Sequence, residues 1–166
     1  MFLDAEGEIL AQPPSRSVAS FEATLEKVER WRALSAKAGK GDRKAAAEAF
    51  LAELALGRLG LEEARARMKE LSLTKEQRQQ AETWLVDVEV ADAMQKARRD
   101  QDAMRKAQER FFELQAEGKV PPEDGNPVNA YYFWSGVAAI ASERGQDDLA
   151  KKAQNRAQAA LKRLQG

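Results

Sequence analysis

The chain has 166 residues and contains neither cysteine nor histidine. Without cysteine there is no thiol nucleophile or redox dithiol, and without histidine there is no imidazole general base. Zinc sites of the Cys/His type are excluded for the same reason. An all-carboxylate metal site or a Ser/Lys pair stays open in principle, but no such pattern stands out. We therefore expect a protein that is not an enzyme and that holds no cofactor and no metal.

The sequence also lacks net charge and long apolar runs. It has 27 Lys and Arg residues against 27 Asp and Glu residues, whereas a duplex-binding protein usually carries a net basic surface. The longest apolar run, at 130–141, is too short to cross a bilayer and contains Ser135 and Gly136. No basic segment follows Met1, as it would in a signal peptide. We expect no nucleic-acid partner and no membrane association. The location is cytoplasmic if the chain is complete as given and is otherwise unknown.

Glycine and proline are scarce, with 10 and 5 residues, and they gather in short clusters. The stretches between them are rich in Ala, Glu, Lys, Leu, Arg and Gln, which favour helix. Apolar residues recur at spacings of three and four, as on one helix face; the first such set is Phe21, Leu25, Val28, Trp31 and Leu34. The pattern predicts an all-α fold of six or seven helices, whose short turns make neighbouring helices antiparallel.

Capping residues and glycines predict where these helices begin and end. The expected helices cover 18–38, 43–59 with Gly60 as the stop, 61–71, 75–117, 127–144, and a last one from Asp147 or Asp148. Thr74 and Gln77 form a capping box, and Asn126 with Pro127 begins a helix after the clearest loop. The stretch 75–117 is one long helix or two with a junction near 99–102. The last helix is expected to turn five residues inward: Ala150, Ala153, Ala157, Leu161 and Leu164.

Five residues of the last two expected helices match the spacing of a tetratricopeptide-type repeat, namely Trp134, Ala138, Gly145, Ala150 and Ala157. This region resembles one such repeat, although Ala141 and Gln154 stand where the family usually has Tyr or Leu. A weaker match lies at 59–64. The resemblance implies antiparallel helical hairpins stacked in a tetratricopeptide-like bundle over 17–166. A generic helical bundle is the alternative.

The first residues predict a different local structure. Residues 2–10, FLDAEGEIL, place two short apolar stretches around a Gly-containing turn, which is typical of a β-hairpin. Together with 17–25 they resemble the end of a thioredoxin fold, which closes with a hairpin and a final amphipathic helix. The dithiol of that family has no match here. The resemblance implies the C-terminal helical region of a larger redox protein, and a simple N-terminal arm is the alternative.

The predicted organisation is therefore an arm or hairpin over 1–16 and a helical repeat-like domain over 17–166. A two-stranded hairpin is marginally stable alone in water. Residues 1–16 are expected to be poorly ordered, docked on the helices, or paired with another chain.

Two charged groups are interpreted as solvated surface. The first consists of Asp87, Glu89 and Asp92, which diverge on a helix and lack the histidine that usually completes a carboxylate metal site. The second is basic: Lys96, Arg98, Arg99, Arg105, Lys106 and Arg110. These residues surround a helix rather than following one side, so i,i+4 ion pairs explain them better than phosphate binding.

Aromatic residues supply the candidate partner contacts. Residues 131–134 are four consecutive aromatics, which point in different directions on a helix, so one core cannot bury them all. Helical repeats bind ligands on the face lined by their first helices, which makes Tyr131, Tyr132 and Trp134 candidates. Packing under the loop at 120–122 is the alternative. Phe112 is the fourth candidate, because only one of Phe111 and Phe112 is expected to face a given core, and the other would seat a neighbouring helix or a second subunit. We hypothesise a protein- or peptide-interaction module, with a homodimer as an alternative.

Overall fold

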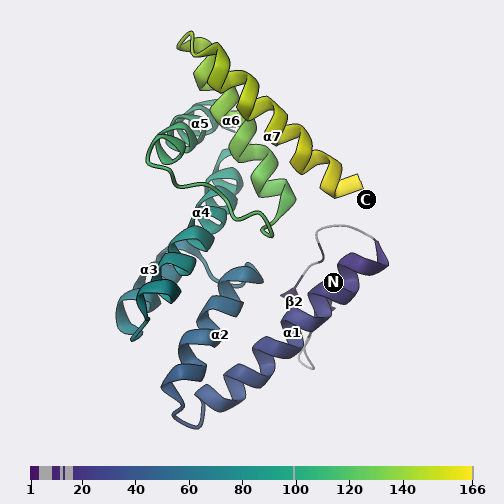
Figure 1. Cartoon of the computed structure of the whole chain (residues 1–166), viewed down its shortest axis with the longest axis vertical. Helices are drawn as coiled ribbons and strands as arrows, with labels where there is room; N and C mark the ends of the chain where they lie inside the picture. Colours follow the sequence, from purple (N-terminus) through teal and green to yellow (C-terminus); the bar gives the residue numbers. More distant parts are fainter. Residues whose placement is uncertain (4–8, 12, 14–16, 99, 166) are drawn as a thin grey trace. The chain divides into compact units, whose positions relative to one another are not determined.

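The computed structural model describes residues 1–3, 9–11, 13, 17–98 and 100–165 (Figure 1). It is 77% helical, which confirms the all-α prediction with a short N-terminal hairpin. The described elements, in chain order, are β1 (Phe2–Leu3), β2 (Ile9–Ala11), α1 (Val18–Ala38), α2 (Arg43–Ala55), α3 (Leu61–Glu70), α4 (Lys75–Ala97), α5 (Gln101–Ala116), α6 (Pro127–Glu143) and α7 (Asp147–Gln165). The chain divides into two compact units, Met1–Val88 and Glu89–Gly166.

Helices begin where the predicted capping side chains lie. Ser17 Oγ accepts from the amide of Ser20 at 3.2 Å, and Asp42 Oδ1 accepts from the amide of Ala45 at 3.0 Å. Each cap satisfies an amide that has no partner inside its helix. The box of Thr74 and Gln77 is reciprocal, with bonds of 3.0 and 3.2 Å. These local signals explain why the predicted starts are confirmed.

The predicted end of α2 is wrong. The helix ends at Ala55 rather than Leu59, and Gly57 with φ +66° turns the chain, while Gly60 precedes α3 as its cap residue. The amide of Arg58 donates to the carbonyl of Glu53 at 3.1 Å, which closes the helix end. Leaving the helix early lets Leu59 enter the core between α2, α3 and α4.

The stretch 75–117 forms two helices, which settles the alternative left open by the sequence. Asp100 separates α4 from α5 and caps α5, because its Oδ1 accepts from the amides of Asp102 and Ala103 at 2.9 and 3.1 Å. Aspartate is favoured at the first position before a helix, because its short carboxylate accepts hydrogen bonds from first-turn amides that have no carbonyl partner within the helix.

The core of the first unit lies between α2, α3 and α4, where the largest buried side chains are Phe50, Leu54 and Trp84. A second cluster joins the hairpin to the helices: Leu10 and Ala11 pack with Val28 of α1. The strands are antiparallel, with Phe2 opposite Ala11.

The described part of the hairpin is therefore docked on the helices, one of the three states expected for it. Arg58 Nη1 also donates to the carbonyl of Leu10 at 3.1 Å. The predicted turn at 4–8 lies outside the described residues. Of the predicted face on α1, Val28 is buried, whereas Phe21 and Leu25 are 40% and 42% exposed.

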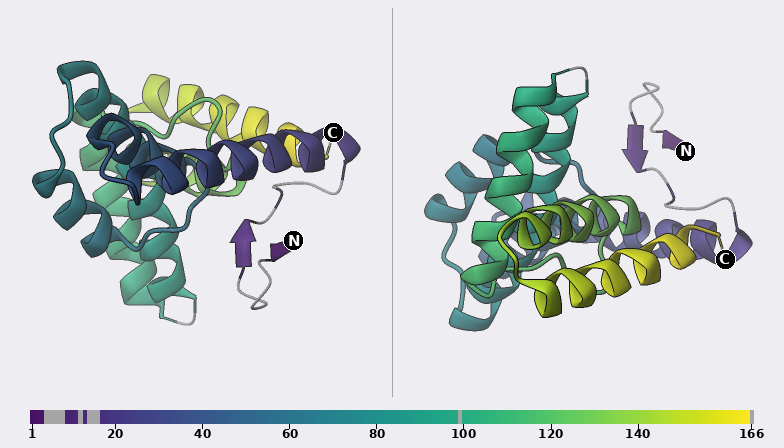
Figure 2. Two further views of the ribbon diagram at one scale, coloured as in Figure 1. Left: turned by 90° about the horizontal axis from the view of Figure 1, so that it is seen from below. Right: turned by 90° about the horizontal axis from the view of Figure 1, so that it is seen from above.

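The second unit is organised around α6, which packs against both α5 and α7 (Figure 2). Gly136 allows the close approach to α5, because a Cβ there would lie 2.9 Å from Phe111 Cδ2 and 3.3 Å from Gln108 Cα. Helix α7 turns a stripe of small residues inward, Ala150, Ala153, Ala157 and Ala160. The prediction that Leu161 points inward is wrong: it is 40% exposed, and Ala160 takes the buried position.

Candidate functional site

The four predicted partner contacts all lie in the second unit, but they do not form one surface. Tyr132 is exposed and Tyr131 half-buried, and their rings meet edge to face with centroids 5.6 Å apart. Trp134 and Phe112 are buried. The structure thus leaves Tyr132 accessible and gives Trp134 and Phe112 partners within the chain.

Phe111 and Phe112 are both buried. Phe111 contacts Phe133 of α6, with ring centroids 5.6 Å apart. Phe112 is covered from another side by Arg144, whose Cζ lies 4.5 Å from the ring centroid. An arginine can cover an aromatic face in this way while its charged head stays in water. Phe112 therefore has little surface left for a second subunit.

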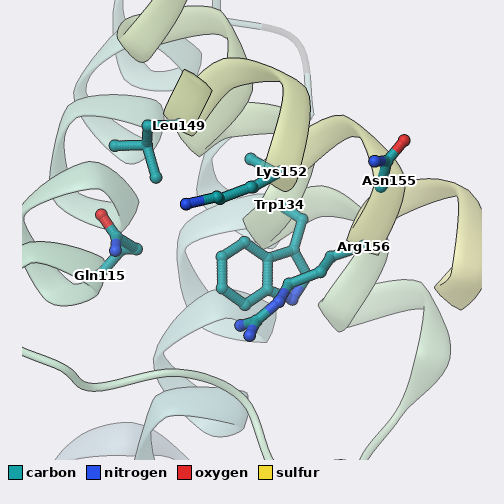
Figure 3. A pocket seen from close by; sticks show the side chains of 7 residues that line it. Gln115, Trp134, Leu149, Lys152, Asn155 and Arg156 are labelled. Carbon is teal, nitrogen blue, oxygen red and sulfur yellow. The ribbon is translucent and has the colours of Figure 1, made fainter. Parts of the chain in front are cut away.

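A hollow of 290 Å³ lies where α5, α6 and α7 meet, and we call it the α7 hollow. Its lining comes from three helices: Gln115, Trp134, Leu149, Lys152, Ala153, Asn155 and Arg156. Figure 3 shows the indole of Trp134 at its centre, with Lys152 extending from α7 toward the side on which Gln115 lies. The floor is apolar, and every charged group around it is a cation.

Trp134 and Arg156 form the fixed part of the hollow. The Cζ of Arg156 lies 4.5 Å from the centroid of the indole ring, a cation–π contact between α7 and α6. The ring of Phe133 also contacts Trp134, edge to face, with ring centroids 5.1 Å apart. Trp134 keeps 8% of its surface exposed. Ala153 and Ala150, packed against α6, set the short distance between the two helices that this contact needs.

The charges on α7 are segregated along the helix. Its acidic residues, Asp147 and Asp148, both lie in the first turn, where they suit the helix dipole. From Leu149 to Gln165 there is no acidic residue, but there are five cations: Lys151, Lys152, Arg156, Lys162 and Arg163. Among the residues that the structure describes, no carboxylate lies within ion-pair distance of Lys152 or Arg156. These two charges are therefore not neutralised inside the described chain.

The acidic group of α4 differs from its prediction. Asp87 is buried rather than solvated. Glu89 is half-buried, and its Oε1 accepts from Arg110 Nε of α5 at 2.7 Å; only Asp92 forms the expected i,i+4 pair, with Lys96 at 2.6 Å. In the described part of the chain, no three His, Cys, Asp or Glu residues are grouped so that they could hold a metal ion.

Arg105 and Arg110 of α5 are held in ion pairs, of which only Arg105–Glu109 has the i,i+4 spacing expected from the sequence. Arg105 binds Glu143 of α6 through both of its terminal nitrogens, at 2.6 and 2.5 Å, and also Glu109 at 3.2 Å. The hydrogen bond from Arg105 lowers the pKa of the Glu143 carboxyl, and the same bond raises the pKa of Arg105. Likewise, the hydrogen bond to Glu89 is the largest cause of the raised pKa of Arg110. These shifts mark links between helices. Arg99 lies outside the described residues.

Sequence reasoning identified Trp134 but missed the cations around it. The acid-free stretch from Leu149 onward was readable in the sequence, yet its meaning depends on which side of α7 faces Trp134. Gln115 gave no signal at all, because only the packing of α5 brings it to the hollow.

No protein-family model matches the chain, and no curated protein or solved structure matches it either. Among the described residues, no helix has both the length and the apolar character that a membrane span needs.

Proposed function

We propose that the chain is a non-enzymatic interaction module that binds a peptide or a segment of another protein. The observation that carries this proposal is the α7 hollow, in which an aromatic floor from α6 is bordered by N–H donors from α7 and by an amide from α5. Tryptophan and arginine are the residues that most often dominate binding energy at protein interfaces. A site built on helices also holds its side chains more firmly than one built on loops.

The α6–α7 hairpin supports the interpretation that the second unit is built like a tetratricopeptide repeat. Gly145 has φ +69° in the turn between the helices, and Ala138, Ala150 and Ala157 are buried where the helices cross. In helical repeats such crossings form the scaffold on which a binding surface is presented. The hairpin would then act as the scaffold, and the α7 hollow as the surface.

A random-peptide display selection on the full-length chain tests the proposal. Enriched peptides should bind with Kd of about 1–100 µM, a range that corresponds to the few contacts of a short peptide. Leu149→Gln, which changes the floor of the hollow, should weaken that binding several-fold. Leu161→Gln makes the same change on the exposed side of α7 and is the matched control.

Two results would contradict the proposal, one its function and one its location. Failure to enrich any peptide would refute the proposed function. Loss of binding in Tyr132→Ala, with Leu149→Gln unchanged, would move the site from the hollow to the tyrosine pair. A homodimer is the remaining alternative for the partner, and light scattering at high protein concentration distinguishes it: a strict monomer excludes it.

A second candidate function is suggested by the first unit. Its hairpin packs on α1, with Phe2 and Phe21 in ring contact at 5.8 Å, in the manner of the closing hairpin and last helix of a thioredoxin-like fold. Four apolar side chains on the hairpin and on α1 are exposed: Leu3, Val18, Phe21 and Leu25. A larger sheet would bury such side chains. The chain would then be the C-terminal accessory region of a thioredoxin-like oxidoreductase whose redox site lies outside these 166 residues.

The mass of the native protein in its own cells tests this second candidate. A mass well above 18.4 kDa, with upstream peptides that contain Cys-x-x-Cys, would support it. A mass equal to that of the 166 residues would refute it and leave the interaction module as the function.

A further inference from the structure

We infer that the α7 hollow takes an acidic peptide segment, whose carboxylates pair with Lys152 and Arg156 while an apolar side chain packs on Leu149 and against the small exposed part of Trp134. This inference rests on the proposed function, because it names the class of peptide that the same site binds.

The cations of α7 lie on two different sides of the helix. Lys152, Arg156 and Arg163 are spaced i, i+4 and i+11, which places them along one edge, beside the buried alanine stripe. Lys151 and Lys162 are also eleven residues apart and lie on the side away from the stripe. The first edge borders the hollow, since Lys152 and Arg156 line it. The helix therefore presents a row of positive charge at the hollow and a separate pair of lysines elsewhere.

Among the described residues, the row at the hollow has no acidic partner, whereas the arginines of α5 do. Arg105 and Arg110 each bind carboxylates of neighbouring helices. Arg163 donates to the carbonyl of Gly125 at 3.0 Å, and Lys152 and Arg156 have no carboxylate partner among the described residues. Like charges that face the same small hollow raise the local positive potential, which attracts carboxylates.

The contact with Trp134 holds Arg156 beside the hollow. The guanidinium carbon lies over the indole ring, and a contact with the ring face uses none of the five N–H donors of the group. A stacked guanidinium has already lost much of its side-chain freedom, so a bidentate pair with a carboxylate costs less entropy. The amides of Gln115 and Asn155 add further donors at the border of the hollow.

The hollow favours a peptide over a nucleic acid. Its volume of 290 Å³ suits a few side chains, and Trp134 and Leu149 give it an apolar floor. The acidic pair Asp147 and Asp148 begins the same helix, and Glu123 and Asp124 precede the Gly125 carbonyl that holds Arg163. A phosphate backbone that followed the row of cations would meet these carboxylates, whereas a short acidic segment ends before them.

Fluorescence anisotropy of the full-length chain with a short labelled peptide, in which Glu alternates with Leu, tests the inference. Two further probes carry Gln or Lys in place of Glu. The double variant Lys152→Glu, Arg156→Glu should bind the Glu peptide at least about 100-fold more weakly, since two charge-assisted contacts become repulsive. The double variant Lys151→Glu, Lys162→Glu changes the net charge equally and should lose less than about 3-fold. Far-UV circular dichroism checks that both variants keep their helices.

The binding of the Glu peptide to the two double variants decides between a specific site and general charge attraction. Binding of the Glu peptide that only the first double variant loses supports the inference. Equal loss in both double variants would show general charge attraction and overturn it. Tighter binding of a single-stranded oligonucleotide with the same dependence on Lys152 and Arg156 would also overturn it. If display selects neutral or basic peptides and the Glu peptide does not bind, the inference fails while the proposed function stands; if no peptide binds at all, both fail.

Discussion

At the scale of single residues, the most demanding position is Gly136. It lies in the middle of α6, where alanine would normally stabilise a helix by about 1 kcal/mol. A Cβ at this position would lie 2.9 Å from the ring of the fully buried Phe111 and 3.3 Å from the backbone of Gln108. Neither neighbour can move freely, so packing decides the identity of the residue.

Gly136→Ala should therefore lower the free energy of unfolding by about 1–2 kcal/mol, because the cost of overpacking exceeds the gain in helix propensity. Urea denaturation followed by circular dichroism measures this change. Gly39→Ala is the control: its Cβ would lie 3.5 Å from the Ser35 carbonyl oxygen and 3.9 Å from that of Ala36, both ordinary contacts, so stability should stay nearly unchanged. A stabilised Gly136→Ala variant would contradict the close packing of α5 on α6.

At the scale of helices, Asp100 is the residue that divides α4 from α5. Its carboxylate accepts from two amides of the first turn of α5. We expect Asp100→Ala to lower the free energy of unfolding by about 1 kcal/mol, the usual value of an N-cap. Asp100→Asn keeps an acceptor and should lose only a small part of that stability. Urea denaturation of the unchanged chain, Asp100→Ala and Asp100→Asn measures these differences. Equal stability of the unchanged chain and Asp100→Ala would refute the capping role of Asp100.

The Arg105–Glu143 pair links α5 to α6 and gives a prediction for pH. Because Arg105 lowers the folded-state pKa of Glu143, the pair stabilises the fold above the ordinary pKa of glutamate and loses this effect as pH falls through the lowered value. In Arg105→Gln, the pKa of Glu143 should rise toward its ordinary value. Carbon-detected NMR titration of the carboxyl group measures it. If the pKa of Glu143 stays low in the variant, Arg105 is not what lowers it.

The helix boundaries show which features of the fold can be predicted from the sequence and which cannot. The starts of α1, α2 and α6 depend on caps that bond two or three residues away, so local reasoning found them. The end of α2 depends on where Leu59 is buried, which is a matter of the core, and two nearby glycines fitted the local pattern equally well. The burial of Phe112 beneath Arg144 and the position of Gln115 at the hollow likewise depend on residues distant in sequence.

At the scale of the whole molecule, the chain forms two compact helical units that differ in their exposed surfaces. The first unit exposes apolar side chains on α1 beside a small hairpin. The second exposes cations on α7 around a tryptophan. The two surfaces underlie the two candidate functions, and the α7 hollow has the more specific chemistry, since it combines an aromatic floor with unneutralised charge.

The measurement that tests this account most directly is an NMR titration of the indole N–H signals with the Glu peptide. The chain has three tryptophans, Trp31, Trp84 and Trp134, so each signal reports on one place and the first two serve as internal controls. The account predicts a saturable shift of the Trp134 signal, with Trp31 and Trp84 unchanged. A Trp134 signal that stays in place at saturating peptide, or shifts no more than the other two, would contradict it.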